Sequence, residues 1–292
     1  MKNETTIPGY IRNIAQSERG PVEYTLSGHG PTILKLTGMS QDCTDSMGNK
    51  PLIEAGFSIL TPSRPGYGKT PSSVGKNAAE AAKAMIALLD TLNIKQVSVI
   101  AVSGGGPTSI YLSAHYPDRV RKLVLEDAVS RNPKEIDPDR YALQKKFYGK
   151  GYTFTCWMLK IIATLSSKTI ARQTFALFGT HDPNEAVKML SKSELKEISL
   201  FYQKQAGSWA KGALNDMEHF TSESDLRAIQ SPTLIIHSHE DRAVCFEFAE
   251  YSHALIRGSE LWEAPSWSHF ISVGPGSENV GQKVVAFLKS EF

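Results

Sequence analysis

Apolar and polar positions alternate in blocks along this chain, and the apolar blocks are short, continuous and rich in β-branched residues. Runs of this kind are typical of strands that are buried on both faces of a parallel sheet. The segments between them carry apolar residues at helical spacing, so the pattern predicts an α/β fold in which strands and helices alternate. The predicted strands span residues 32–36, 57–60, 97–102, 122–126, 233–237 and 259–263.

Helices are predicted between these strands and at the end of the chain. Residues 77–92 place five apolar side chains on one face, and Asn77 followed by Glu80 makes a capping-box-like start. A second helix over residues 107–120 opens with a proline, which suits a first helical turn. A last helix covers about residues 280–288. Together the elements predict a mostly parallel central sheet flanked by helices.

The alternation stops between residues 132 and 221, where helical composition continues without a strand pattern. Because the sheet pattern resumes intact afterwards, we interpret residues 132–221 as a helical cap inserted into a core domain of residues 1–131 and 222–292. The alternative is that these helices simply cover the sheet. Three apolar residues of the insertion either line a pocket from above or pack internally: Phe154, Trp157 and Met158.

Composition and charge narrow the class of protein. The 292 residues include 32 Lys and Arg and 30 Asp and Glu. The chain has no basic run, so we expect no nucleic-acid partner. No apolar run reaches the roughly 18 residues of a membrane-spanning helix, and the first residues lack an apolar signal core. We therefore expect a cytoplasmic protein with no membrane partner. Cys43, Cys156 and Cys245 are widely spaced and odd in number, so we expect free thiols.

One predicted strand ends on a serine and three glycines, VSGGG. Such a turn either cradles a phosphate or presents a nucleophile. Both phosphate-binding motifs lack one required glycine. The dinucleotide fingerprint has Ser109 in place of its third glycine, and the P-loop pattern that ends in GKT has Ser63 in place of its first. A nucleophile elbow needs small residues two positions to either side of the serine, because its backbone is strained. Ala101 and Gly105 meet that condition, so the pattern predicts Ser103 as a nucleophile.

A serine nucleophile needs a base, and the base needs an acid that orients it. His269 follows the last predicted strand, and Asp241 follows the strand before it. Ser103, Asp241 and His269 thus occur in the chain order that accompanies such an elbow, which predicts a catalytic triad. Three other carboxyl residues compete for the place of the acid: Glu126, Asp127 and Glu240.

The segment HSHED offers a different chemistry. His237, His239 and Asp241 match the pattern H-x-H-x-D, and strand alternation would place both histidines on one face. Metal sites take three or four ligands with supporting partners, but this chain has Arg242 where a further histidine is usual. A metallohydrolase is therefore the minor alternative, and we expect neither a metal nor a cofactor.

Several further segments resemble the α/β-hydrolase-fold family over nearly the whole chain. LTGMS is similar to its oxyanion loop, with Thr37 in place of histidine, and SRPGYGKT is similar to its turn after the fourth strand. HYPDRVRKLVLED resembles the stretch after the elbow, while Ser238 and Ser268 replace glycines in the acid and histidine loops. The resemblance implies a cap in the insertion. It also implies that the N–H groups of Met39 and Gly104 stabilise an oxyanion.

These residues predict a serine hydrolase that cleaves a small or medium carboxylic ester, thioester or lactone through an acyl-enzyme. C–C bond hydrolysis and haloperoxidase-like perhydrolysis use the same triad and remain alternatives. A ligand receptor without catalysis is another, because a fold does not determine function. The expected partner is a small ester-like molecule. The sequence leaves the substrate itself and the oligomeric state open.

Overall fold

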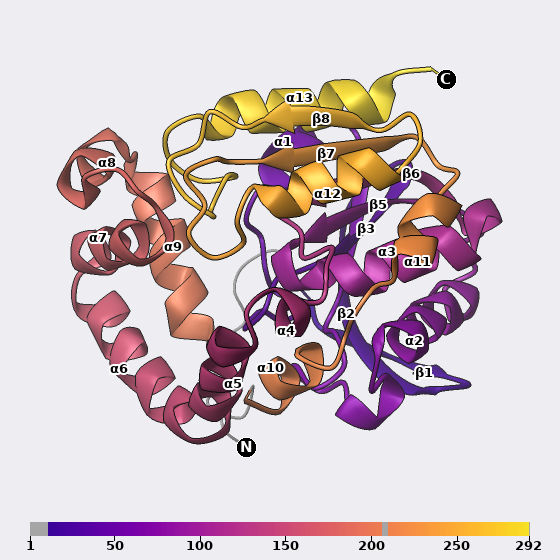
Figure 1. Ribbon diagram of the computed structural model, residues 1–292, viewed down its shortest axis with the longest axis horizontal. Helices are drawn as coiled ribbons and strands as arrows, with labels where there is room; N and C mark the ends of the chain where they lie inside the picture. The colour runs from indigo at the N-terminus through magenta and orange to yellow at the C-terminus, as the bar shows by residue number, and fades with distance from the viewer. Residues whose placement is uncertain (1–10, 206–209, 292) are drawn as a thin grey trace.

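A central eight-stranded sheet organises the computed structural model, which describes residues 11–205 and 210–291 (Figure 1). The strand order is β1-β2-β4-β3-β5-β6-β7-β8. Neighbours from β4 to β8 are parallel, whereas β2 is antiparallel to both β1 and β4, so the prediction of a mostly parallel sheet is confirmed. The strands are β1 (Asn13–Ser17), β2 (Gly20–Gly28), β3 (Thr32–Leu36), β4 (Ser58–Pro62), β5 (Val97–Val102), β6 (Val120–Glu126), β7 (Thr233–His237) and β8 (Glu260–Glu263).

The first two strands are absent from the sequence-based prediction. In β1 only Ala15 is buried, so this edge strand carries little of the apolar signal that marks a strand. In β2 the buried positions include Glu23, whose carboxylate accepts hydrogen bonds from the Ser63 hydroxyl at 2.7 Å and from the Lys69 N–H at 3.0 Å. A buried acid that ties a strand to a distant loop breaks the apolar pattern, which is why the prediction misses it.

Helices cover both faces of the sheet (Figure 1). Strand residues alternate between two cores: Leu34 and Val99 belong to one, whereas Ile33 and Ile100 belong to the other. The alternation follows from the two-residue period of a strand. The first core is covered by α2 (Ala78–Thr91), α3 (Gly106–His115), α11 (Glu223–Ala228) and α12 (Glu247–Leu255), and the second by α1 (Asn49–Glu54) and α13 (Ser277–Lys289).

The predicted start of α2 is confirmed in its main feature. The Asn77 side chain accepts a hydrogen bond from the Glu80 N–H at 2.9 Å, which satisfies one free donor of the first turn. The Glu80 carboxylate accepts from the N–H of Lys76, one residue earlier than in a capping box. The helix predicted over residues 107–120 ends early at His115, and a short 3-10 turn follows it before β6.

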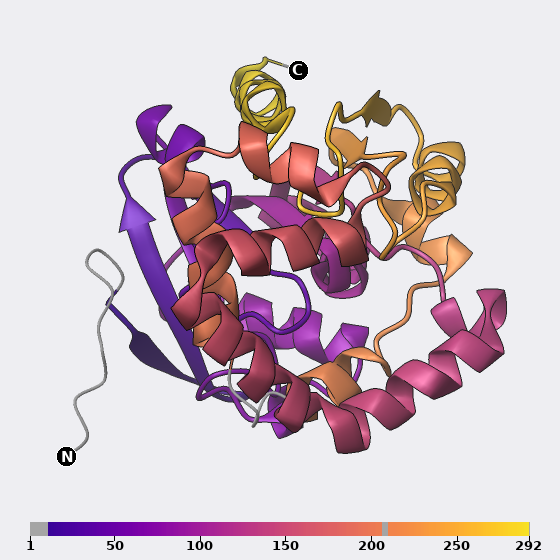
Figure 2. The same ribbon diagram turned by 90° about the vertical axis from the view of Figure 1, so that its left-hand side faces the viewer.

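Between β6 and β7 the described residues form helices and no sheet strand, as the sequence pattern predicts. We call residues 132–221 the cap; its limits stay a prediction. The cap helices lie beside the core in Figure 1 and in front of it in Figure 2. They have an apolar cluster of their own, which also includes Met47 and Val273 of the core. They are α4 (Pro133–Ile136), α5 (Pro138–Lys146), η4 (Phe147–Gly151), α6 (Tyr152–Leu165), α7 (Ser167–Phe178), α8 (Pro183–Met189), α9 (Lys192–Lys204) and α10 (Ala210–Asp216).

Two predictions made from composition can be compared with the fold. All three cysteines are free thiols; Cys43 and Cys156 are buried and Cys245 is exposed. Within residues 11–205 and 210–291, every helix is too short or too polar to cross a bilayer. The cytoplasmic location stays a prediction.

Candidate active site

The turn between β5 and α3 holds Ser103 in a strained conformation. Its backbone φ is +48°, a left-handed value that non-glycine residues seldom adopt. The glycines after it are required by close packing: a Cβ on Gly105 would lie 2.3 Å from the Leu36 carbonyl oxygen, and one on Gly106 would lie 2.2 Å from that of Val129. The turn therefore has the geometry of the predicted elbow, and the strain lifts the serine hydroxyl toward the open edge of the sheet.

His269 and Asp241 form a hydrogen-bonded pair next to this turn. His269 Nδ1 lies 2.6 Å from Asp241 Oδ2, and the other carboxylate oxygen accepts the N–H groups of Ala243 and Val244 at 2.7 and 2.9 Å. Burial alone would raise the Asp241 pKa. The His269 charge and the hydrogen bonds from His237, His269 and Val244 outweigh burial and lower that pKa below its usual range. Asp241 is thus an anion suited to orient an imidazole.

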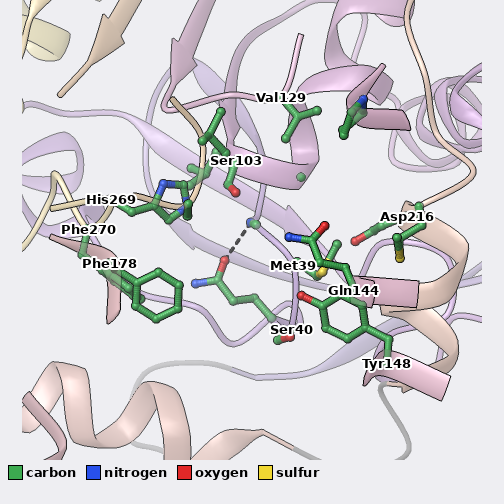
Figure 3. A pocket seen from close by; sticks show the side chains of 18 of the residues that line it. Met39, Ser40, Ser103, Val129, Gln144, Tyr148, Phe178, Asp216, His269 and Phe270 are labelled. Atoms are coloured by element: carbon green, nitrogen blue, oxygen red, sulfur yellow. Dashed lines mark hydrogen bonds between the residues drawn. The ribbon is translucent and has the colours of Figure 1, made fainter. Parts of the chain in front are cut away.

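Ser103 and His269 lie on the same wall of one pocket. Figure 3 shows the serine hydroxyl and the imidazole ring as neighbours that point into the same space. Asp241 lies behind the histidine and is almost completely buried. The fold therefore brings together the three residues that the sequence predicts, although they come from the ends of three different strands.

The competing carboxyl residues lie in different environments. Asp127 is buried next to the pair and accepts the Ser238 N–H at 3.1 Å; burial and the Asp241 charge raise its pKa well above the usual range. Asp127 is therefore easier to protonate than Asp241. Glu240 is half-exposed beside His181 and Glu126 lines the pocket floor, where burial raises its pKa to about 7. Asp241 is the member that accepts the His269 hydrogen bond.

The three residues of the metallohydrolase alternative do not form one ligand set: His237 Nε2 lies 3.4 Å from Asp241 Oδ2, but His239 lies apart from both. His237 is buried, and its Nε2 lies 2.8 Å from the Val244 carbonyl oxygen. His239 is exposed, stacks on Phe246 and lies 3.5 Å from a Glu263 oxygen. In the described chain, one group can bring three ligand atoms within 4.8 Å of one another: Asp127, Asp241 and His269. That group includes the predicted acid and base, Asp241 and His269, and leaves out both histidines of HSHED.

The two expected oxyanion donors lie on adjoining loops. A Cβ on Gly104 would lie 3.4 Å from the Met39 nitrogen, and one on Gly38 would lie 3.3 Å from the Ser103 Cβ. Gln41 holds the first loop by accepting the Gly38 N–H at 2.7 Å, the dashed line in Figure 3. The two loops are thus in close contact beside Ser103, and the oxyanion role of the Met39 and Gly104 N–H groups stays a prediction.

Arg64 connects both loops to the cap. Its guanidinium donates to the Gly38 carbonyl at 2.9 Å and to the Gly104 carbonyl at 3.2 Å, and it pairs with Asp216 of α10 through both nitrogens. Tyr67 completes the cluster by donating to Asp216 at 2.7 Å. The Gly38 carbonyl belongs to the same peptide unit as the Met39 N–H, so the guanidinium orients and polarises that donor.

This cluster was not recognised as part of the site from the sequence. A single arginine in a turn has a structural role more often than a functional one, and Asp216 is 152 positions away. The arginine is almost fully buried, and long charged side chains are seldom buried without a function or a partner. The sequence carries no signal that reports this burial.

A pocket of about 440 Å³ lies between the core and the cap above Ser103. Most of its lining is apolar or aromatic, as Phe178, Phe270 and Tyr148 in Figure 3 illustrate. The expectation for the apolar stripe of α6 is wrong on both counts, because the stripe neither lines the pocket nor packs internally. Its residues are exposed instead: Phe154, Trp157 and Met158. The opposite face of α6 lines the pocket through Tyr152, Thr155, Cys156 and Leu159.

Comparisons with known proteins agree with this architecture. The model of the alpha/beta hydrolase fold family matches residues 36–274. An uncharacterized hydrolase of Bacillus subtilis, YcgS, is 33% identical over 279 residues, which are 93% of this chain and 96% of that protein. The chain therefore belongs to the α/β hydrolase fold family, and we describe it as a hydrolase of that fold.

Two other matches extend this comparison. An α/β hydrolase fold protein from Nakamurella multipartita superposes with a TM-score of 0.82 at 27% identity, covering 95% of this chain and 99% of that one. A 2-hydroxymuconate semialdehyde hydrolase of Pseudomonas putida is 26% identical over 187 residues, 61% of this chain and 58% of its own length. The fold is thus common to proteins that carry different names.

Proposed function

We propose that this protein is a serine hydrolase that cleaves uncharged, largely apolar carboxylic esters, thioesters or lactones. The observation that carries the proposal is the 2.6 Å contact of His269 with ionised Asp241 beside a serine held at φ +48°. An isolated strained serine is only a turn. A strained serine that shares a pocket wall with an acid-oriented imidazole has the parts needed for nucleophilic catalysis.

The reaction follows from these positions. His269 takes the proton of the Ser103 hydroxyl while the oxygen attacks the acyl carbonyl, and the N–H groups of Met39 and Gly104 bind the oxyanion. His269 then donates the proton to the leaving oxygen or sulfur, and the acyl-enzyme forms. A water molecule loses its proton to His269 and attacks the acyl carbonyl of the Ser103 ester. The bond to the Ser103 oxygen then breaks, and His269 returns the proton to that oxygen, which releases the acid and restores the enzyme. Asp241 stabilises the charged imidazole in both halves.

The charges of the pocket favour a neutral substrate. The described lining residues include two cations: Lys35 bonds to Asp45 at 2.8 Å, and Arg140 donates to backbone carbonyls at 3.3 and 3.4 Å. Four carboxyl side chains share the lining: Asp45, Glu126, Asp137 and Asp216. An anionic substrate would meet more negative than positive groups and would lose hydration without compensation.

The experiment compares wild type with Ser103→Ala on a panel of nitrophenyl esters of increasing acyl length, with aliphatic lactones alongside. We expect wild-type turnover and a loss on the order of 10⁵- to 10⁶-fold in Ser103→Ala. A fluorophosphonate should label wild type at Ser103, as mass spectrometry of the digested protein will show. Ser113→Ala is the matched control, since Ser113 is a buried serine of α3 that does not line the pocket.

Other outcomes would replace the proposal. Wild type that hydrolyses no ester and leaves Ser103 unlabelled would make this protein a ligand receptor. Cleavage of a carbon–carbon bond in a β-diketone, without ester cleavage, would keep the triad but overturn the substrate class. Loss of activity with a chelator, together with full activity in Ser103→Ala, would point to metal-dependent hydrolysis.

A further inference from the structure

The outer surface of the cap carries most of the large apolar side chains that this protein exposes. Thirteen large hydrophobic residues are exposed in the described chain, and ten of them lie between residues 136 and 189. Exposed apolar patches of this extent mark interaction surfaces in monomeric proteins. Five of the ten stand on α6 at the spacing of one helical face: Phe154, Trp157, Met158, Ile161 and Leu165.

These five residues are not needed to hold the cap together. The opposite face of α6 packs toward the core and lines the pocket through Tyr152, Cys156 and Leu159. The outward residues include Leu165, which is 80% exposed, and Phe154, which is 63% exposed. Figure 2 shows the cap helices in front of the sheet. The stripe is therefore available to a partner.

The same part of the chain has an unusual charge pattern. Residues 140–181 contain no Asp or Glu, although the whole chain has a net charge of only +2. Six of the cations in this segment are exposed in the structure, and one of them, Lys145, pairs with Glu218 at 2.6 Å. The cations of the segment are Arg140, Lys145, Lys146, Lys150, Lys160, Lys168 and Arg172.

We propose that this outer face of the cap docks on the surface of an anionic lipid bilayer, with α6 lying in the plane of the interface. Helices that lie in an interface combine Trp, Phe and Leu on one face with Lys and Arg around it. Anionic headgroups attract such cations, and the apolar stripe enters the boundary of the acyl chains. The prediction of no membrane partner rested on the absence of a membrane-spanning run, and a helix lying in the interface needs none.

A second copy of the chain is the competing occupant, and the charges disfavour it. If two caps met through this face, residues 140–181 of one copy would lie against residues 140–181 of the other. This segment has cations but no Asp or Glu, so it would supply no acidic partner for the cations of the other copy. Like charges held close at an interface weaken association, whereas an anionic bilayer compensates them. The surface therefore matches lipid better than it matches itself.

Other exposed apolar residues of the cap border the pocket above Ser103: Ile136, Phe147 and Leu177. An apolar ester that reached this rim would meet apolar side chains there. Docking goes beyond the proposed hydrolysis and does not depend on it, because none of the surface residues belongs to the triad.

The test is flotation of the full-length protein with phosphatidylglycerol vesicles and with phosphatidylcholine vesicles. We expect binding to phosphatidylglycerol at low salt, weak binding to phosphatidylcholine, and release by 0.5 M NaCl as screening grows. The double variant Phe154→Ser/Trp157→Ser should lose about tenfold or more in affinity. Leu26→Ser is its matched control, because Leu26 is 50% exposed on β2, outside the cap.

A second pair of variants tests the charges. Lys160→Gln and Lys168→Gln should each weaken binding to phosphatidylglycerol about fivefold, while Lys83→Gln on α2 should not. Failure to bind phosphatidylglycerol, or equal binding by the double apolar variant and wild type, would overturn the proposal. A dimer in light scattering that Trp157→Ser converts to monomer would assign the face to a second copy instead. Ser103→Ala should bind vesicles like wild type, so a failure of the proposed hydrolysis would leave this result unchanged.

Discussion

The two walls of the pocket are built in opposite ways. The core wall presents Ser103 and His269, which are held from behind by buried hydrogen bonds and by closely packed glycines, as at Asp241 and Gly105. The cap wall is largely apolar, and its helix α6 uses one face for the pocket and leaves the other exposed. Core changes should therefore act on the chemical step, and cap changes should act on substrate choice and on contacts outside the molecule.

The largest effect is expected at the acid of the core wall. Asp241→Asn should lower kcat about 10⁴-fold, because an amide cannot stabilise the charged imidazole or keep its tautomer. Ester turnover by Asp241→Asn and by wild type across a range of pH values measures this loss of kcat. Asp127→Asn should cost less than about tenfold, since Asp127 does not accept the His269 hydrogen bond and its raised pKa makes its charge easier to remove.

Glu240→Gln is the control for the acid, because Glu240 is the half-exposed neighbour of Asp241. It should retain wild-type turnover. A loss in Glu240→Gln that matches that of Asp241→Asn would show that the acid has been assigned to the wrong residue.

The next effect tests the link between the two walls. Arg64→Gln alone would strand the buried Asp216 charge and destabilise the protein by about 3–5 kcal/mol, so the informative variant is Arg64→Gln/Asp216→Asn. We expect kcat to fall roughly 10- to 100-fold with KM within about threefold, because the polarised Met39 donor acts mainly on the transition state.

The matched control for this link is Arg119→Gln. Arg119 also bonds to one carboxylate, that of Asp90, and to two backbone carbonyls, but it lies outside the pocket. Equal kcat losses in both variants, or a stable double variant with full kcat, would reduce Arg64 to a purely structural residue.

A smaller effect is expected on the cap wall. Leu159→Ala enlarges the pocket, so the preferred acyl chain should lengthen and KM for short esters should rise by up to about tenfold. The value of kcat for the best ester should change by less than about threefold. Ile161→Ala on the exposed face of the same helix should leave the chain-length profile unchanged. A large kcat loss in Leu159→Ala would contradict the division of labour between the walls.

The smallest effect on activity is expected at Glu126, whose signature is stability. Its pKa of about 7 in the folded protein lies above the unfolded value of 4.5. The buried carboxyl therefore does not lower the free energy of unfolding below pH 4.5, and it lowers that free energy progressively as the pH rises toward 7. Glu126→Gln should therefore raise the free energy of unfolding at pH 8 by about 2–3 kcal/mol and change it little near pH 4.5. Urea unfolding at both pH values measures it, with exposed Glu263→Gln as the control. An equal gain in the free energy of unfolding of Glu126→Gln at both pH values would show that Glu126 does not titrate in this range.

Much of this molecule could be predicted from local pattern. Six strands were placed because buried parallel strands are continuous apolar runs. The prediction of the elbow rests on a strained turn that permits only small neighbours, and the prediction of the triad rests on residues that follow strand ends in a known order. The prediction failed for β2, where buried Glu23 serves a distant loop and interrupts the apolar run.

The sequence by itself determined the candidate chemistry of this protein, since the predicted triad of Ser103, Asp241 and His269 follows from residue type and from places after strands. Only the tertiary structure decided in which direction burial and charge shift the pKa of each carboxyl, which peptides Arg64 contacts and which face of α6 meets the pocket. The physical reason is that burial and charge pairing depend on residues far apart in the chain. Local periodicity shows that a helix has an apolar stripe, but only packing shows whether that stripe is covered.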